Sequence, residues 1–142
     1  MTVKEYLEQA RKLNIRIDYL MNDLQRMKQL SQSYASPSFD SDRIITSQSS
    51  DAPFVRCIAR INEMEQEIDK EMDLLFALKK QIRSVVSTLK DPEAEVILLY
   101  HYLDGLSWME ISRLLYIHRT TVTLYHDQAL SKLVLPDDAI QI

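Results

Sequence analysis

The chain has 142 residues, of which 46% are hydrophobic and 27% are charged, as is usual for a soluble globular or helical protein. Its net charge of −4 is unfavourable for a protein that binds nucleic acid by charge alone, and its single cysteine excludes an internal disulfide. We see no secretory signal pattern and no apolar run of the roughly 18 residues that a membrane span needs, so we expect a cytoplasmic protein that does not contact a membrane. One glycine, four prolines and no alternating strand pattern predict an all-α fold.

The first segment, residues 1–30, is predicted to form one long amphipathic helix. Thr2 and Glu5 have the spacing of a capping box at its start. Apolar residues then follow in alternating steps of three and four, which is the heptad spacing of a coiled coil. They are Val3, Tyr6, Ala10, Leu13, Ile17, Leu20, Leu24 and Met27. A helix packed on its own chain has the same spacing, so the pattern leaves both arrangements open.

Residues 31–52 interrupt this pattern. Eight serines fall between Ser31 and Ser50, together with Pro37 and several aspartates. This composition buries too little apolar surface to offset the entropy of ordering, so it predicts a flexible linker.

A second long helix is predicted over residues 53–90. It continues the spacing of three and four with one interruption, at Glu71. The apolar positions are Phe54, Cys57, Ile61, Met64, Ile68, Leu75, Leu78, Ile82, Val85 and Leu89. The two long helices could fold back as a hairpin in one chain or pair between chains as a homodimer. Cys57 lies on the apolar stripe, which favours packing over redox or metal chemistry.

Residues 91–135 are predicted to form a helix-turn-helix domain, followed by a tail over residues 136–142. Asp91 and Pro92 have the pattern of a helix start, and Asp104-Gly105 that of a helix end. Ser107, with Glu110 three residues later, predicts a capping box for the second helix. A turn over residues 116–118 then leads to a third helix over about residues 119–132.

Helical spacing predicts which side chains of these helices face inward. The predicted inward residues are Val96, Leu99, Tyr100 and Leu103 in the first helix, Trp108, Ile111, Leu114 and Leu115 in the second, and Val122, Ala129, Leu130 and Leu133 in the third. Tyr125 and His126 remain alternatives for one further inward position of the third helix.

The start of the third helix carries the candidate DNA contacts, because base edges are contacted by the N-terminal residues of such a helix. Arg119 can bond a guanine or a phosphate, and threonines offer hydroxyls to phosphates or bases and methyls to thymine. The candidates are His118, Arg119, Thr120, Thr121, Thr123 and Leu124, together with Arg113 of the second helix, which we expect near the phosphate backbone. In the alternative interpretation, Thr120 or Thr121 only caps the helix.

Residues 91–142 hold eight acidic residues and only three basic ones, so we expect the segment alone to bind DNA weakly. A partner, or two copies acting together, would then supply affinity. The three histidines lack the spacing of a zinc site, and no phosphate-binding loop, nucleophile motif or pair of catalytic carboxylates is visible. We therefore expect no enzyme activity, no metal and no cofactor.

The segment DPEAEVILLYHYLDGLSWMEISRLL, with TTV and AL-SKL after it, resembles region 4 of bacterial sigma factors, a module that contacts promoter DNA. The whole layout is similar to phage- and prophage-encoded transcription regulators of Gram-positive bacteria that are related to late-gene activators. The resemblance implies a transcription regulator that binds double-stranded DNA together with host RNA polymerase. Two alternatives remain: a protein-interaction adaptor that uses the same fold without DNA, and a small-terminase-like DNA-packaging protein, which ring-sized oligomers would favour.

Overall fold

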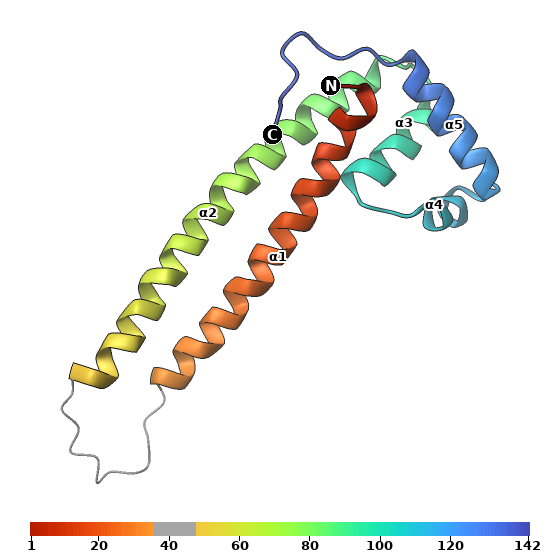
Figure 1. Cartoon of the computed structure of the whole chain (residues 1–142). Coiled ribbons are helices and arrows are strands. Elements are labelled where there is room, and N and C mark those ends of the chain that lie inside the picture. The colour runs from red at the N-terminus through yellow and green to blue at the C-terminus, as the bar shows by residue number, and fades with distance from the viewer. Residues whose placement is uncertain (36–47) are drawn as a thin grey trace. The chain divides into compact units, whose positions relative to one another are not determined.

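The computed structural model describes residues 1–35 and 48–142 (Figure 1). Its elements are α1 (Val3–Ala35), α2 (Gln48–Ser87), α3 (Pro92–Leu98), the π-helix η1 (Leu99–Leu103), α4 (Trp108–Leu115) and α5 (Arg119–Lys132). All regular elements in these residues are helical, which confirms the predicted all-α fold with two long helices at its start. In the same residues, no helix combines the length and the apolar character that crossing a membrane requires.

The chain divides into two compact units, and α1 and α2 contribute to both. The hairpin unit consists of Arg16–Met72. The other unit, called here the terminal unit, combines Met1–Ile15 with Asp73–Ile142. The terminal unit therefore differs from the predicted domain over residues 91–135, because it also contains the start of α1 and the end of α2.

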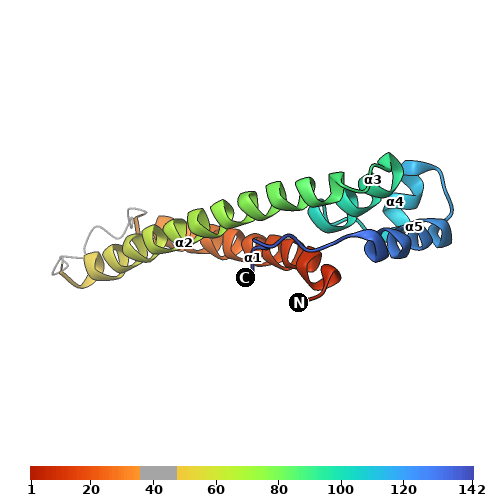
Figure 2. The ribbon, with the colours of Figure 1, turned by 90° about the horizontal axis from the view of Figure 1, so that it is seen from above.

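In the hairpin unit, α1 and α2 lie antiparallel (Figures 1 and 2). The buried apolar side chains of this unit are Ile17, Cys57, Ile61, Met64 and Ile68, which all belong to the predicted stripes. The Cys57 thiol, which is buried, donates to the Met27 carbonyl oxygen over 3.5 Å. Glu71, which interrupts the stripe, forms an ion pair of 3.1 Å with Arg16. Of the two predicted arrangements, the helices of this unit adopt the one within a single chain.

The two long helices extend into both ends of the predicted linker over residues 31–52, since α1 continues to Ala35 and α2 begins at Gln48. Serine hydroxyls are accommodated in the last turns of α1 because they donate to helix carbonyls three residues earlier. Ser31 donates to the Lys28 carbonyl oxygen over 2.8 Å, and Ser33 donates to that of Leu30 over 2.8 Å. The central part of the predicted linker, residues 36–47, lies outside the described residues.

At the start of α1, the predicted capping box is confirmed. The Thr2 hydroxyl accepts from the Glu5 amide over 3.1 Å, and the Glu5 carboxylate accepts from the Thr2 amide over 2.7 Å. The hydrogen bond from the Thr2 amide to the carboxylate is the largest cause of the lowered pKa of Glu5. The cap fixes where α1 begins, and hence which of its side chains face the core of the terminal unit.

That core joins residues from both ends of the sequence. Tyr6, Leu7 and Ala10 of α1 are fully buried. They pack in one cluster with residues of α2, α3, η1, α5 and the segment after it: Leu78, Ile82, Val85, Val86, Ala94, Leu98, Tyr102, Leu103, Ala129 and Leu133. Most buried apolar positions of α1 and α2 belong to the predicted stripes, but Leu7 and Val86, which the stripes did not include, are buried as well.

The predicted inward face of residues 91–103 is partly wrong. Val96, Leu99 and Tyr100 are only half-buried, whereas Ile97 and Leu98 are almost completely buried. The prediction assumed one inward face, but α3 packs on two sides: Leu98 joins the core with α1 and α2, and Ile97 joins a second cluster with α4 and α5. The π-turn of η1 adds a residue to the helical turn and so changes which side chains face inward after Leu98.

Leu78→Ala tests the stability of the terminal unit. The Leu78 side chain is fully buried, so its truncation removes apolar contacts and leaves a cavity. We expect a loss of about 2–5 kcal/mol in the free energy of unfolding, measured by urea titration followed by circular dichroism. The matched control is Phe76→Ala on the same helix, where the side chain is 57% exposed and the expected loss is below about 1 kcal/mol. Equal losses in the two variants would contradict this placement of α2.

Candidate nucleic-acid interface

Helices α4 and α5 are joined by a turn of three residues, Tyr116, Ile117 and His118. Ser107 caps α4: its hydroxyl accepts from the Glu110 amide over 3.2 Å, as predicted. Gly105 has a φ of 72°, so the only glycine of the chain supplies the left-handed residue expected after the preceding helix.

The cap of α5 is formed by His118 rather than by Thr120 or Thr121. Its Nδ1 atom accepts from the Thr120 amide over 3.2 Å and lies 2.8 Å from the Thr120 hydroxyl. An imidazole nitrogen thus takes the place of the hydroxyl or carboxylate oxygen that usually caps a helix. Because sequence rules for caps favour Ser, Thr, Asp and Asn, they gave no reason to select His118.

The angle between α4 and α5 is fixed by a small apolar cluster. Ile97, Ile111 and Val122 are each fully buried and contact one another. Trp108, Leu115 and Tyr125 cover this cluster from its edges. The predicted inward residues Ile111 and Val122 therefore lie inside, whereas Leu114, also predicted inward, is 52% exposed.

A second cluster, of aromatic and histidine side chains, joins α5 to η1 and α4. His126 is buried; its Nδ1 donates to the Asp127 carboxylate over 3.0 Å, and its Nε2 accepts from the Tyr102 hydroxyl over 2.7 Å. Since Asp127 can only accept when ionised, this pattern assigns the proton of neutral His126 to Nδ1. The position of His126, which the sequence left open, is thus in the core.

His101 of η1 links this cluster to α1. Its ring stacks on Trp108 with centroids 3.7 Å apart. The Leu106 carbonyl oxygen lies 2.9 Å from Nδ1 and can only accept, so Nδ1 carries the proton and Nε2 accepts from the Arg11 guanidinium over 2.6 Å. Asn14 of α1 also donates to the Leu103 carbonyl oxygen, over 3.1 Å.

This environment keeps His101 neutral. Burial is the main cause that lowers its pKa from 6.5 to about 4; the hydrogen bond to Leu106 opposes the shift, and the charge of Arg11 adds to it. Protonation would place a second positive charge next to the Arg11 guanidinium. Burial also lowers the pKa of His126.

The candidate DNA contacts lie on the outer side of this arrangement. His118, Arg119, Thr120 and Leu124 are exposed, as is Arg113 on α4, while Thr121 and Thr123 are half-buried. The Thr123 hydroxyl donates to the Thr120 carbonyl oxygen over 3.0 Å, and the Thr120 hydroxyl is engaged by His118. Within the described residues, Arg113 and Arg119 form no ion pair, so their guanidinium groups are available to a ligand.

Arg119 lines an open groove between the starts of α4 and α5. The groove has a volume of about 430 Å³ and is lined by Ser107, Trp108, Met109, Arg119, Thr120 and Thr123. Ser107 and Trp108 lie at the start of α4, and Arg119 and Thr120 lie at the start of α5, so the groove adjoins two helix N-termini, where an anion such as a DNA phosphate is favoured.

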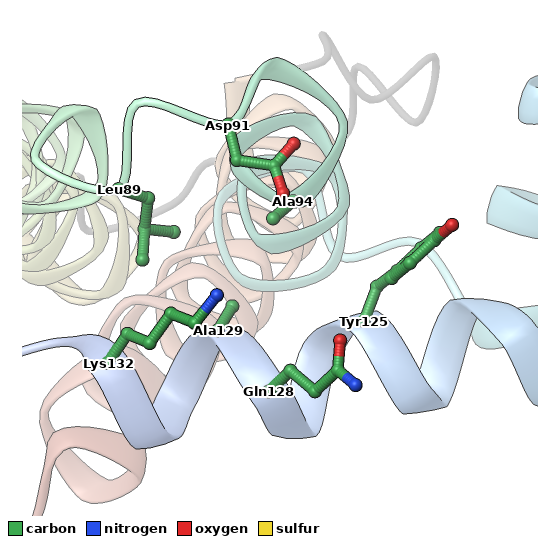
Figure 3. A pocket seen from close by; sticks show the side chains of 7 residues that line it. All are labelled: Leu89, Asp91, Ala94, Tyr125, Gln128, Ala129 and Lys132. Atoms are coloured by element: carbon green, nitrogen blue, oxygen red, sulfur yellow. The ribbon is translucent and has the colours of Figure 1, made fainter.

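The hollow in Figure 3 is much smaller than this groove. It lies between the start of α3 and α5, is lined by Asp91, Tyr125, Lys132 and four other residues, and has a volume of only about 30 Å³. This is the space of about one water molecule, which is too small for a substrate.

The exposed face of α4 is more apolar than predicted. Leu114 is 52% exposed, Met109 is 44% exposed, and Tyr116, directly after the helix, is 93% exposed. Tyr116 also has a φ of 57°, a left-handed conformation that is unfavourable for a residue with a bulky side chain. Sequence reasoning placed Tyr116 in the turn but did not identify it as an exposed aromatic.

The lowered pKa of His101 predicts a loss of stability in acid. His101 binds a proton near pH 6.5 in the unfolded chain but only near pH 4 in the folded chain. Its contribution to the free energy of unfolding is therefore constant above this range and is lost as the pH falls through it. His101 alone accounts for a loss of up to about 3 kcal/mol. The measurement is the free energy of unfolding from urea titrations between pH 7 and 4.

The matched variants are His101→Asn and His118→Asn. The first should make the dependence on pH shallower, because the buried titrating group is gone. The second replaces an exposed histidine by a residue that can also cap a helix, so it serves as the control for loss of a histidine. An unchanged slope in His101→Asn would contradict the assignment.

Comparison with protein-family models, with curated proteins and with solved structures finds no match to this chain. Function is therefore inferred from the residues of α4, α5 and their surroundings.

Proposed function

We propose that this protein is a transcription regulator that binds promoter DNA through α4 and α5, which would act as a helix-turn-helix related to sigma region 4. The observation that carries this proposal is the exposed start of α5 on a rigid base. Arg119 is exposed there and forms no ion pair with the described residues, and the groove beside it lies at two helix N-termini.

In this proposal, α5 enters the major groove with Arg119 and Thr121 nearest the bases. Arg119 has the length and the donors to bond a guanine edge. Thr120 and Thr123 contribute their methyl groups rather than their hydroxyls, which are used inside the helix. Arg113 on α4 is placed to contact the phosphate backbone.

The charge balance supports a partner in DNA binding. The terminal unit holds ten lysines and arginines against eleven aspartates and glutamates, so it lacks the excess of positive charge that gives strong non-specific binding. Host RNA polymerase is the partner that the resemblance to sigma region 4 implies. In the proposed complex, polymerase supplies affinity and this chain supplies selectivity.

A second candidate function, a protein-interaction adaptor, is favoured by the exposed apolar face of α4. Met109, Leu114 and Tyr116 are too exposed to stabilise the fold by burial, and exposed apolar side chains suit a protein interface. This adaptor would use the same helices without DNA. Selection of bound DNA distinguishes the two functions.

Arg119→Ala tests the placement of the DNA-binding helix. We expect loss of selective binding, at least tenfold in affinity for the selected sequence, because a bidentate contact to guanine contributes about 1–3 kcal/mol of discrimination. The helical content should not change, since Arg119 is exposed. The matched control is Arg60→Ala, an exposed arginine of the hairpin unit that pairs with Glu63.

The target sequence is found by selecting bound duplexes from a random DNA library near physiological salt, with and without host RNA polymerase. The proposal expects an enriched motif in the arm with polymerase, and Arg119→Ala should lose it. A motif that persists in Arg119→Ala would place the contacts elsewhere. If neither arm enriches a motif, the adaptor function is favoured instead.

The salt dependence of binding is a further expected outcome. Residues 91–142 offer three basic side chains, Arg113, Arg119 and Lys132, so one chain should release few counterions. The slope of log K against log salt should then be no steeper than about −3 per chain for the protein alone. A much steeper slope, measured by fluorescence anisotropy on the selected duplex, would mean that basic residues outside this segment contact DNA.

A further inference from the structure

The tail, residues 136–142, follows α5 and returns along α1 and α2 in the terminal unit (Figure 1, dark blue). Two glutamines hold its backbone. The Ile140 amide donates to Gln81 Oε1 over 3.0 Å, and the Ile140 carbonyl oxygen accepts from Gln9 Nε2 over 2.9 Å. Both polar backbone groups of one tail residue are therefore paired with side-chain amides from two different helices.

The same glutamines also bond to the tail backbone two residues before and two residues after Ile140. Gln81 Nε2 donates to the Asp138 carbonyl oxygen over 3.0 Å, and Gln9 Oε1 accepts from the Ile142 amide over 2.9 Å. The paired residues thus alternate along the tail, as they do in a peptide that adds to the edge of a sheet. Recognition through the backbone sets few demands on the side chains of the bound segment.

The glutamines are held in place independently of the tail. Tyr6, which is fully buried, donates from its hydroxyl to Gln81 Oε1 over 2.7 Å, and its carbonyl oxygen accepts from Gln9 Nε2 over 3.2 Å. Burial is the main cause that raises the pKa of Tyr6 to about 12, so its hydroxyl remains a donor. A site whose polar groups are already oriented loses less entropy when it binds a peptide.

The tail fills only part of the space beside α2. An open hollow of about 390 Å³ lies between them and is lined by Lys80, Gln81 and Val85 of α2 and by Pro136, Asp138 and Ile140 of the tail. Ala139 and Ile140 are the tail residues that pack on the core of the unit, and both are only partly buried. The tail is thus attached by a few hydrogen bonds and a small apolar contact.

We propose that Gln9 and Gln81 form a binding site for an extended peptide segment, and that the tail of a second copy of this chain occupies it in place of the chain's own tail. The tail is the ligand whose fit the structure demonstrates. The link from α5 to the tail is not helical, so exchange between copies requires no helix to unfold. A tethered tail has an effective concentration in the millimolar range, so the tail of a second copy competes with it only where chains are held together at a comparable local concentration.

The site itself is tested with a labelled peptide of residues 136–142. The receptor is the full chain carrying Ile140→Asp, which weakens docking of its own tail and leaves both glutamines in place. We expect saturable binding by fluorescence anisotropy, weakened at least tenfold by the added changes Gln9→Ala and Gln81→Ala. Circular dichroism verifies that each receptor is folded, and Ile140→Ala replaces Ile140→Asp if the latter unfolds.

A peptide methylated on the amide nitrogen of Ile140 is the matched control. It keeps every side chain but cannot donate to Gln81, so it should bind about tenfold more weakly. Equal binding of the two peptides would overturn recognition through the backbone, and so would absence of peptide binding to a folded receptor.

Exchange between copies is tested by mixing two complementary variants. One carries Ile140→Asp and so has a vacant site; the other carries Gln9→Ala with Gln81→Ala and so has an undocked tail. Energy transfer between dyes on the two variants should appear in the mixture and be competed away by the free peptide. Peptide binding without energy transfer would overturn the exchange between copies and assign the site to a peptide from another source.

Discussion

The arrangement of the terminal unit depends on the burial of Tyr6, Leu7 and Ala10 against the end of α2 and the helices that follow it. These three side chains are fully buried, and each apolar side chain of that size contributes on the order of 1–3 kcal/mol when removed from water. Without the first turns of α1, residues of α3, η1 and α5 would lose the apolar surface they pack against. The base of the candidate DNA interface is therefore supplied in part by the opposite end of the sequence.

Polar contacts make this packing specific. Arg11 and Asn14 each bond to η1, at His101 and at the Leu103 carbonyl oxygen. A π-turn leaves helix backbone groups in unusual positions, and side chains from a neighbouring helix can pair with them. The His101 ring stacks on Trp108, and His126 accepts a hydrogen bond from the Tyr102 hydroxyl, so the helix proposed to contact DNA packs on a rigid support.

Much of the helical pattern could be predicted from the sequence because it follows from local chemistry. The apolar stripes of α1 and α2, the caps at Thr2 and Ser107, and the left-handed Gly105 depend on spacing and on the residue type itself. The grouping into units could not be predicted in this way, because it depends on contacts between distant residues. Leu114 shows the limit: its spacing is that of an inward residue, but the small cluster under α4 ends before reaching it.

The start of α5 was predicted from the sequence, but the bonds that its residues form were not. Arg119 lies where a helix start predicts it, whereas the capping role of His118 and the internal bonds of Thr120 and Thr123 depend on side-chain rotamers that a sequence does not specify. For the tail, only its bounds, residues 136–142, were predicted, and its contacts were not. Its contacts with Gln9 and Gln81 are backbone contacts, and such contacts leave little trace in the sequence of the bound segment.

The bond between Gln9 and Ile140 joins residues that are 131 positions apart, which has a consequence for the order of folding during synthesis. The hairpin unit is formed by residues 16–72 alone and can pair its helices as soon as they leave the ribosome. The terminal unit cannot form until residues 73–142 have been made, and until then Tyr6 and Leu7 lack the apolar side chains that they pack against. Because contacts of such long separation close slowly, the apolar side chains of residues 1–15 stay exposed until residues 73–142 have been made.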